Sequence, residues 1–146
     1  MLTLKTVYFT GGAQHPPKQV KFDFYYIHAV NCTIFSSAFL KQPWLSDANK
    51  IRLLEWKGRN DLTLYASRRS PKPLMDEITH YKPKSPGPWD GIIERVSNHN
   101  DDGHAAKLVR ALANGEQICK PFEDNQNFRV KRKMWLQLGH MGKSAL

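Results

Sequence analysis

The sequence predicts an all-α protein, an irregular bundle of about five to six helices that form a single helical domain over residues 1–146. In most segments of the chain, apolar residues recur at helical spacing. Clusters of proline and glycine interrupt the chain between these segments, as they do between helices. The alternation that is typical of a strand is confined to the sequence KTVYF near the start.

The longest predicted helix covers Ser46–Arg69, which is about six turns at 3.6 residues per turn. Ser46 is a residue type that caps helix N-termini, and Asp47 follows it where the helix dipole favours a negative charge. Arg68 and Arg69 stand at the other end, where the dipole favours cations. These signals place both ends of the helix in the sequence.

Lys57 and Asp61 interrupt the amphipathic pattern of this helix. On a helical wheel they lie in the middle of the arc that holds the apolar residues, one turn apart on the same face. A charge is unfavourable to bury unless it is paired or neutralised. The two residues could form a simple i, i+4 ion pair, or they could belong to a functional site. The other members of the arc are Ile51, Leu53, Leu54, Gly58, Leu62, Leu64 and Tyr65.

The segment Val20–Leu40 is apolar on nearly every side, so we expect one helix there and expect it to be the most buried helix of the fold. A membrane span is the alternative, because Phe24–Leu40 carries no formal charge. Too many polar side chains lie in this stretch for a span, and we expect no membrane contact. These side chains are His28, Asn31, Cys32, Thr33, Ser36 and Ser37.

The remaining segments are shorter. The N-terminal residues 1–14 are interpreted as irregular, with a break at Gly11 and Gly12. Asp101 and Asp102, in the turn before His104, are expected to cap the helix that follows. Further helices are predicted over 73–80, 89–98, 104–118 and 134–141.

Composition sets limits on the partners of the chain. The net charge of +9 permits an anionic partner, but the basic residues are spread and only Arg129–Lys133 forms a tight run. We therefore expect no nucleic-acid partner. Cys32 and Cys119 are expected to be free and buried, which suits a reducing compartment, and the N-terminus has no signal-peptide pattern. Together these features predict a cytoplasmic protein.

Three ionisable groups stand where an apolar residue is expected: His28 in the apolar segment, Lys57 with Asp61, and His104 in line with Leu108. Taken singly, each has a plain structural explanation, such as a hydrogen bond to a backbone carbonyl or to a nearby turn. Taken together, they indicate a site, because functional sites of helical bundles are built from inward-facing polar side chains.

Lys57 offers specific chemistry. Burial disfavours the charged form of a lysine, and a neutral amine can add carbon dioxide to become a carbamate. A carbamate is a carboxylate and therefore a metal ligand, and imidazole suits iron, zinc and copper. His28, Lys57 and His104 are thus predicted to converge as partial ligands of a non-haem metal. The chain has no HxxxH, ExxH, CxxC or glycine-rich phosphate motif that would make the signal specific.

Several long runs resemble the C-terminal part of the questin oxidase family of fungal aromatic-polyketide pathways. They are AQHPPKQVKFDFYYIHAVNCTIFSSAFL, QPWLSDANKIRLLEWKGRNDLTLYASR, DDGHAAKLVRALANGEQICKPFED and MWLQLGHM. The resemblance covers almost the whole chain, from about residue 8 to residue 141.

The resemblance implies a Baeyer-Villiger-type oxidase or ring-opening oxygenase that acts on anthraquinone-type polyketides with NADPH as reductant. Some similar proteins are described as non-haem iron enzymes with histidines and a carboxylated lysine as ligands. On that basis Lys57, in LLEWKGR, and His28, in YYIHAVN, are carried over as metal ligands, with His104, in DDGHAAK, as a ligand or a supporting donor. Lys57, Asp61 and His104 are the predicted catalytic residues.

Proteins of this family are much longer than 146 residues, and their N-terminal parts supply further histidines. We therefore expect the chain to be the C-terminal part of a larger helical enzyme. Its expected partners are an aromatic polyketide and either a full-length relative or the missing N-terminal part. The alternative is an inactive helical fragment that acts as a docking partner.

Overall fold

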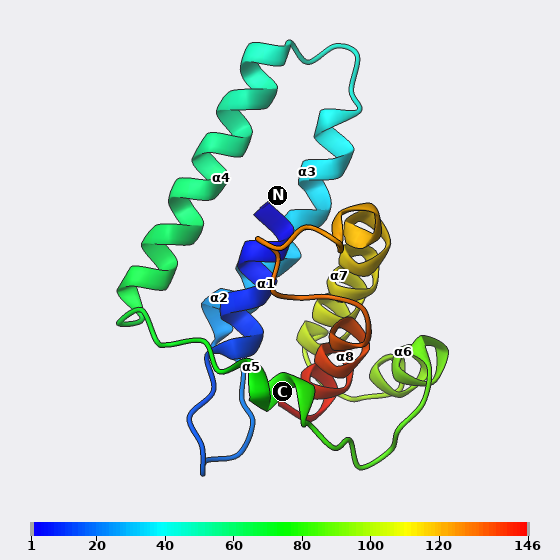
Figure 1. The fold of residues 1–146 in the computed structure, drawn as a ribbon. Helices are drawn as coiled ribbons and strands as arrows, with labels where there is room; N and C mark the ends of the chain where they lie inside the picture. The colour runs from blue at the N-terminus through cyan, green and yellow to red at the C-terminus, as the bar shows by residue number, and fades with distance from the viewer. Residues whose placement is uncertain (1, 146) are drawn as a thin grey trace.

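The computed structural model describes residues 2–145, with side chains over residues 2–143, and this range is built from helices without a strand (Figure 1). The all-α prediction is therefore confirmed for the described part of the chain. The helices outnumber the expected five to six, because one predicted helix is divided and the N-terminus adds another. They are α1 (Leu2–Gly12), α2 (Phe24–Asn31), α3 (Thr33–Leu40), α4 (Asp47–Ser67), α5 (Met75–Thr79), α6 (Trp89–Ser97), α7 (His104–Cys119), the short 3-10 helix η1 (Lys120–Phe122) and α8 (Lys133–Ala145).

Helix α7 lies at the centre of the best-packed part of the fold, between α8, α6 and α2. Its predicted apolar face is fully covered, and Gly115 lets it approach α8 so closely that a Cβ there would lie 2.7 Å from the Trp135 ring. The start of α7 also follows the prediction, because the Asp101 carboxylate accepts the Ala105 N–H at 3.0 Å. The buried residues of the central face are Leu108, Val109, Ala111 and Leu112.

The N-terminus corrects the predicted fold. The sequence suggests an irregular segment, whereas residues 2–12 form α1, most of whose side chains are buried. Gly11 and Gly12 do not break this helix. A Cβ on Gly12 would lie 2.7 Å from that of Pro73, and one on Gly11 would overlap the Leu138 side chain. The glycines therefore serve close packing against α5 and α8, which outweighs their low helix propensity.

The segment Val20–Leu40 is the second correction. It forms two helices, because α2 begins after the Asp23 cap and Cys32 separates it from α3. It is also not the most buried part of the fold: Thr33 is the only buried residue of α3, and Phe35 is 54% exposed. Apolar composition predicted burial, but the described part of the chain places no element over the outer side of α3.

Helix α4 follows its prediction closely at both ends. Ser46 accepts the Asn49 N–H at 3.4 Å, and the helix ends at Ser67, within two residues of the expected boundary. Its burial differs from the prediction, because Asp61 is the only buried residue of the helix. Two members of the predicted apolar arc, Ile51 and Leu62, are more than 60% exposed.

The two cysteines are free within the described range, as predicted, but their environments differ. Cys119 is buried, and this burial raises the pKa of its thiol to about 12. Cys32 is exposed at the break between α2 and α3, so its predicted burial is wrong. Over the same range, the helices lack the combined length and apolarity that a bilayer span requires.

Candidate functional site

The inner face of α4 presents a buried ion pair. The Lys57 ammonium contacts both carboxylate oxygens of Asp61, one turn further along the helix. Only 12% of the Lys57 side chain and 7% of the Asp61 side chain are exposed, so water screens the pair poorly. The predicted inward orientation of both residues is therefore confirmed.

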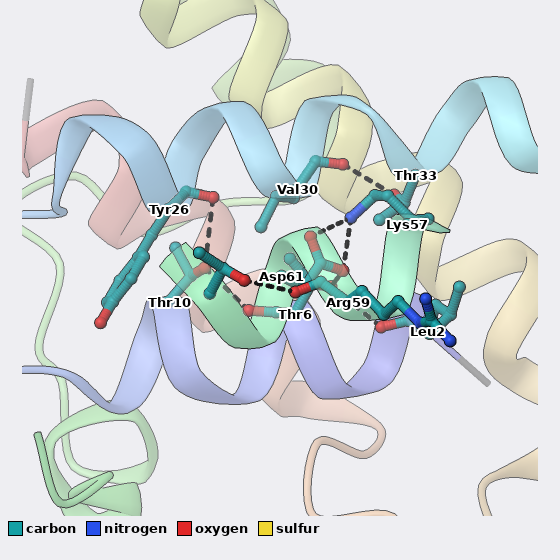
Figure 2. A network of polar contacts seen from close by, with 10 residues as sticks. Leu2, Thr6, Thr10, Tyr26, Val30, Thr33, Lys57, Arg59 and Asp61 are labelled. Atoms are coloured by element: carbon teal, nitrogen blue, oxygen red, sulfur yellow. Dashed lines mark hydrogen bonds and ion pairs between the residues drawn. The ribbon is translucent and has the colours of Figure 1, made fainter. Parts of the chain in front are cut away.

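Helix α1 supplies the next partner of this pair (Figure 2). The fully buried hydroxyl of Thr6 donates to Asp61 Oδ2 at 3.0 Å and lies equally close to the Leu2 carbonyl oxygen. One turn on, the Thr10 hydroxyl lies 2.7 Å from the Thr6 carbonyl and 3.4 Å from the Tyr26 carbonyl of α2. A continuous set of polar contacts thus joins α4, α1 and α2 beneath an otherwise apolar surface.

Aromatic rings pack beside this polar set. The Phe9 ring centroid lies 4.9 Å from that of Tyr26 and 5.4 Å from that of Tyr65. Burial, and then the charge of Asp23, raises the pKa of Tyr26 to about 12. Its hydroxyl therefore stays protonated and donates to the Tyr65 carbonyl at 3.3 Å.

Three pockets border α4, and we call them together the α4 groove. The first, of about 450 Å³, lies between α1 and α4 over Asp61, and the second, of about 340 Å³, lies between α3 and α4 over Lys57. A third pocket of about 440 Å³ shares lining residues with both. The groove is mostly apolar, with the ion pair at its base. Its lining includes Leu2, Tyr8, Phe9, Phe35, Phe39, Leu40, Leu54 and Tyr65.

The structure places the predicted histidines away from this groove. His28 lies two residues after Tyr26, about 200° further around α2, and so on the opposite side of that helix. Its ring centroid is 5.2 Å from that of His104 and 4.6 Å from that of Phe24. The His104 Nδ1 contacts the Asp102 carboxylate, and this contact lowers the pKa of Asp102.

The predicted convergence of His28, Lys57 and His104 is therefore only partial. The structure brings the two histidines together, and it brings Lys57 to Asp61 instead. The lysine amine contacts the Asp61 carboxylate, and its carbamylation and metal ligation stay predictions. Within residues 2–145, no three His, Cys, Asp or Glu side chains gather closely enough to hold a metal ion.

Sequence reasoning missed Thr6, which donates to the ion pair, and Thr10 and Tyr26, which continue the polar contacts from it. A signal for α1 exists: Thr3, Thr6 and Thr10 recur at i, i+3 and i+7, which places one polar stripe on a helix. Interpreting Gly11 and Gly12 as a break concealed it. The contribution of Tyr26 has no local signal, because it depends on how α2 packs over α1.

Comparison with known proteins gives a consistent group of matches. A family model described as questin oxidase-like matches residues 1–112, a range that includes the whole ion-pair network. The chain is 41% identical over 137 residues to "Oxidoreductase AflY" of Aspergillus parasiticus, which is 93% of this chain and 28% of that relative.

Two further relatives carry more specific names. The chain is 41% identical over 141 residues to "Baeyer-Villiger oxidase ptaJ" of Pestalotiopsis fici, covering 93% of this chain and 32% of that relative. It is 40% identical over 137 residues to the questin oxidase of Aspergillus fumigatus, covering 92% and 31%. The chain thus spans less than a third of the length of these curated relatives.

Proposed function

The chain belongs to the questin oxidase-like family, and from that premise we propose that it serves as an oxidoreductase of fungal polyketide metabolism. Its substrate class is an anthraquinone-type aromatic polyketide, and its reaction is oxidation or ring opening of the Baeyer-Villiger type. Relatives named as Baeyer-Villiger and questin oxidases support the reaction class.

The proposed reaction inserts one oxygen atom between a ring carbonyl carbon and its neighbouring carbon, so that a ketone becomes an ester or lactone. The second atom of dioxygen leaves as water. The two electrons that this requires come from NADPH as a hydride, which leaves NADP⁺, and one further proton from solvent is consumed in forming the water. NADPH enters the proposal by resemblance, and no residue of this chain is assigned to hold it.

The observation that carries the proposal is the α4 groove with an ion pair at its base. Ligand sites for small aromatic molecules are mostly apolar, with a few fixed polar groups that set orientation. A planar polyketide would lie against Tyr8, Phe9 and Tyr65 in the first pocket. Its phenol would donate to the Asp61 carboxylate, which lines this pocket and which the Lys57 ammonium holds from the side of the second pocket. The buried setting strengthens both contacts.

Iron has a weaker basis in this chain. The described residues bring two imidazoles together, from His28 and His104, whereas Lys57 contacts Asp61 on α4. This arrangement does not form a complete site for a non-haem iron, and no step of the proposed reaction is assigned to the metal. Metal binding by the two histidines stays a prediction, as does a catalytic role for His104.

The second candidate is a helical unit that docks onto another part of a questin oxidase-like enzyme without chemistry of its own. The large exposed apolar side chains of α3 and α4 favour this function. The two candidates make different predictions for a small aromatic ligand: the first requires that the α4 groove bind it, and the second does not.

The test is binding of 1,8-dihydroxyanthraquinone to the purified chain, followed by quenching of tryptophan fluorescence and by calorimetry. We expect saturable binding that Lys57→Met and Asp61→Asn each weaken about tenfold or more, because a hydrogen bond to a charged group is worth about 1.5–3 kcal/mol. Circular dichroism would establish that each variant keeps its helices.

Arg59→Met is the matched control. Arg59 pairs with Glu55 on the same helix with the same i, i+4 spacing, but both side chains are more than half exposed. This variant should bind the anthraquinone within about twofold of the unmodified chain, since exposed pairs contribute little. The absence of saturable binding, or equal loss in all three variants, would contradict the proposed groove function.

A further inference from the structure

Exposed apolar side chains are concentrated on one part of the molecule, residues 33–69, which we call the α3–α4 arm. Eight of the twelve large hydrophobic side chains that are more than 36% exposed belong to it, including Trp44 at 71% and Trp56 at 61%. The arm makes up about a quarter of the chain, so this concentration is not an average surface property. Apolar patches of this kind mark surfaces that another molecule covers.

The arm also differs in its packing. Thr33 and Asp61 are the only buried residues of its two helices, and the loop between α3 and α4 projects beyond the rest of the bundle (Figure 1). Its exposed residues are not confined to the α4 groove: Trp44 and Trp56 line none of the three pockets that border α4. A small ligand in the groove would therefore leave both tryptophans exposed.

We propose that the α3–α4 arm is the docking surface for the part of a questin oxidase-like chain that lies outside the region matched by this protein. The arm falls within residues 1–112, which match the family model, so its apolar surface occurs in a segment that the family shares. The relatives have more than two thirds of their length outside the matched region. That remainder is large enough to cover the arm.

Charge distinguishes this occupant from a second copy of the same chain. The arm carries seven Lys and Arg residues against three Asp and Glu residues, a net charge of +4 in a chain of net charge +9. Two copies that met through their arms would bring like charges together, which is unfavourable. The surface that covers the arm is thus apolar at its centre and acidic where it faces the exposed Arg52.

Hydrogen–deuterium exchange read by mass spectrometry tests this proposal on two intact proteins: this chain and the full-length questin oxidase of Aspergillus fumigatus. In each, the exchange rate of the segment aligned with residues 33–69 is divided by that of the segment aligned with α7, the internal standard. We expect this ratio to be about tenfold lower or more in the relative, because a covered helix opens less often.

Sedimentation velocity on this chain, across a range of concentrations, gives its mass in the same buffer. A monomer whose arm exchanges rapidly, beside a relative whose aligned arm is protected, is the expected result. Equal ratios in the two proteins would overturn the proposal, and so would a dimer of this chain whose own arm is protected, because the occupant would then be a second copy. The proposal rests on family membership and not on the proposed substrate, so failure of anthraquinone binding would leave it standing.

Discussion

Helices α7 and α3 show that apolar sequence and burial are separate properties. The central face of α7 is completely covered by α8, α6 and α2, although every third or fourth residue of that helix is polar or charged. Helix α3 contains TIFSSAFL, with fewer charges, and yet keeps only Thr33 buried. An apolar pattern indicates which helix surface is favourable to bury, and the packing of the other elements determines whether that surface is covered.

The same contrast holds between the glycines of the two regions. In α7 and α8, Gly115 and Gly139 each lie so close to a tryptophan ring that a Cβ would meet it at under 3.0 Å. In α4, a Cβ on Gly58 would have its nearest neighbour at 3.4 Å, the mobile end of Leu2. The region of α6, α7 and α8 therefore has no room for an added side-chain atom at these glycines, whereas the α3–α4 arm has room at Gly58.

The largest expected effect comes from shortening one leucine in each region. Leu108→Ala should lower the free energy of unfolding by about 2–5 kcal/mol, because the side chain is fully buried and leaves a cavity. Leu62→Ala, at a residue that is 69% exposed, should change it by less than about 0.5 kcal/mol. Urea unfolding followed by circular dichroism measures both values.

Similar losses in these two variants would contradict the comparison. They would mean that Leu62 is covered in solution, by a second copy or by a rearranged arm. Repeating the unfolding experiment at two protein concentrations separates these causes, since only association makes the midpoint depend on concentration.

A single added methyl group is expected to change the free energy of unfolding by a smaller amount, with opposite signs in the two regions. Gly115→Ala should destabilise the chain by about 1–3 kcal/mol, because the Trp135 ring has no room to move. Gly58→Ala should stabilise it by about 0.5–1 kcal/mol, since alanine favours the helix and meets only a flexible side chain. Thermal unfolding would report the two shifts, and shifts of the same sign would remove the distinction in packing.

Local signals were sufficient to predict much of this fold. The Ser46 cap, the acidic turn before His104 and the amphipathic pattern of α7 each depend on residues close in sequence, and the structure follows them. The errors concern burial and close approach. Gly11 and Gly12 are explained by Pro73 and Leu138, which no local pattern connects to them.

For the candidate site, too, the contacts within one helix were predictable and those between helices were not. Lys57 and Asp61 share one helix, so their spacing alone predicted that they meet, and they do. His28 and His104 lie on separate helices, α2 and α7, and their contact depends on how these two helices pack against each other. Helical periodicity gives the face of each helix but not the angle at which two helices pack.

The smallest effect concerns the titration of a buried histidine, which lies outside the arm, because residues 33–69 contain no histidine. His140, on α8, is 5% exposed, and its Nε2 lies 3.0 Å from the Gly87 carbonyl oxygen. Burial lowers the pKa of His140 below its usual value of 6.5, against the opposing effect of this hydrogen bond, and the nearby Arg95 charge lowers it further.

A lowered pKa means that, just below pH 6.5, the unfolded chain binds a proton at residue 140 that the folded chain does not bind. The contribution of His140 to stability is thus complete above pH 6.5 and is lost as the pH falls below that value. His140→Gln keeps a donor for Gly87 and cannot titrate, so its free energy of unfolding should fall less between pH 7 and pH 5.5 than that of the unmodified chain. Equal slopes for His140→Gln and the unmodified chain would show that the buried imidazole is not the source of acid sensitivity.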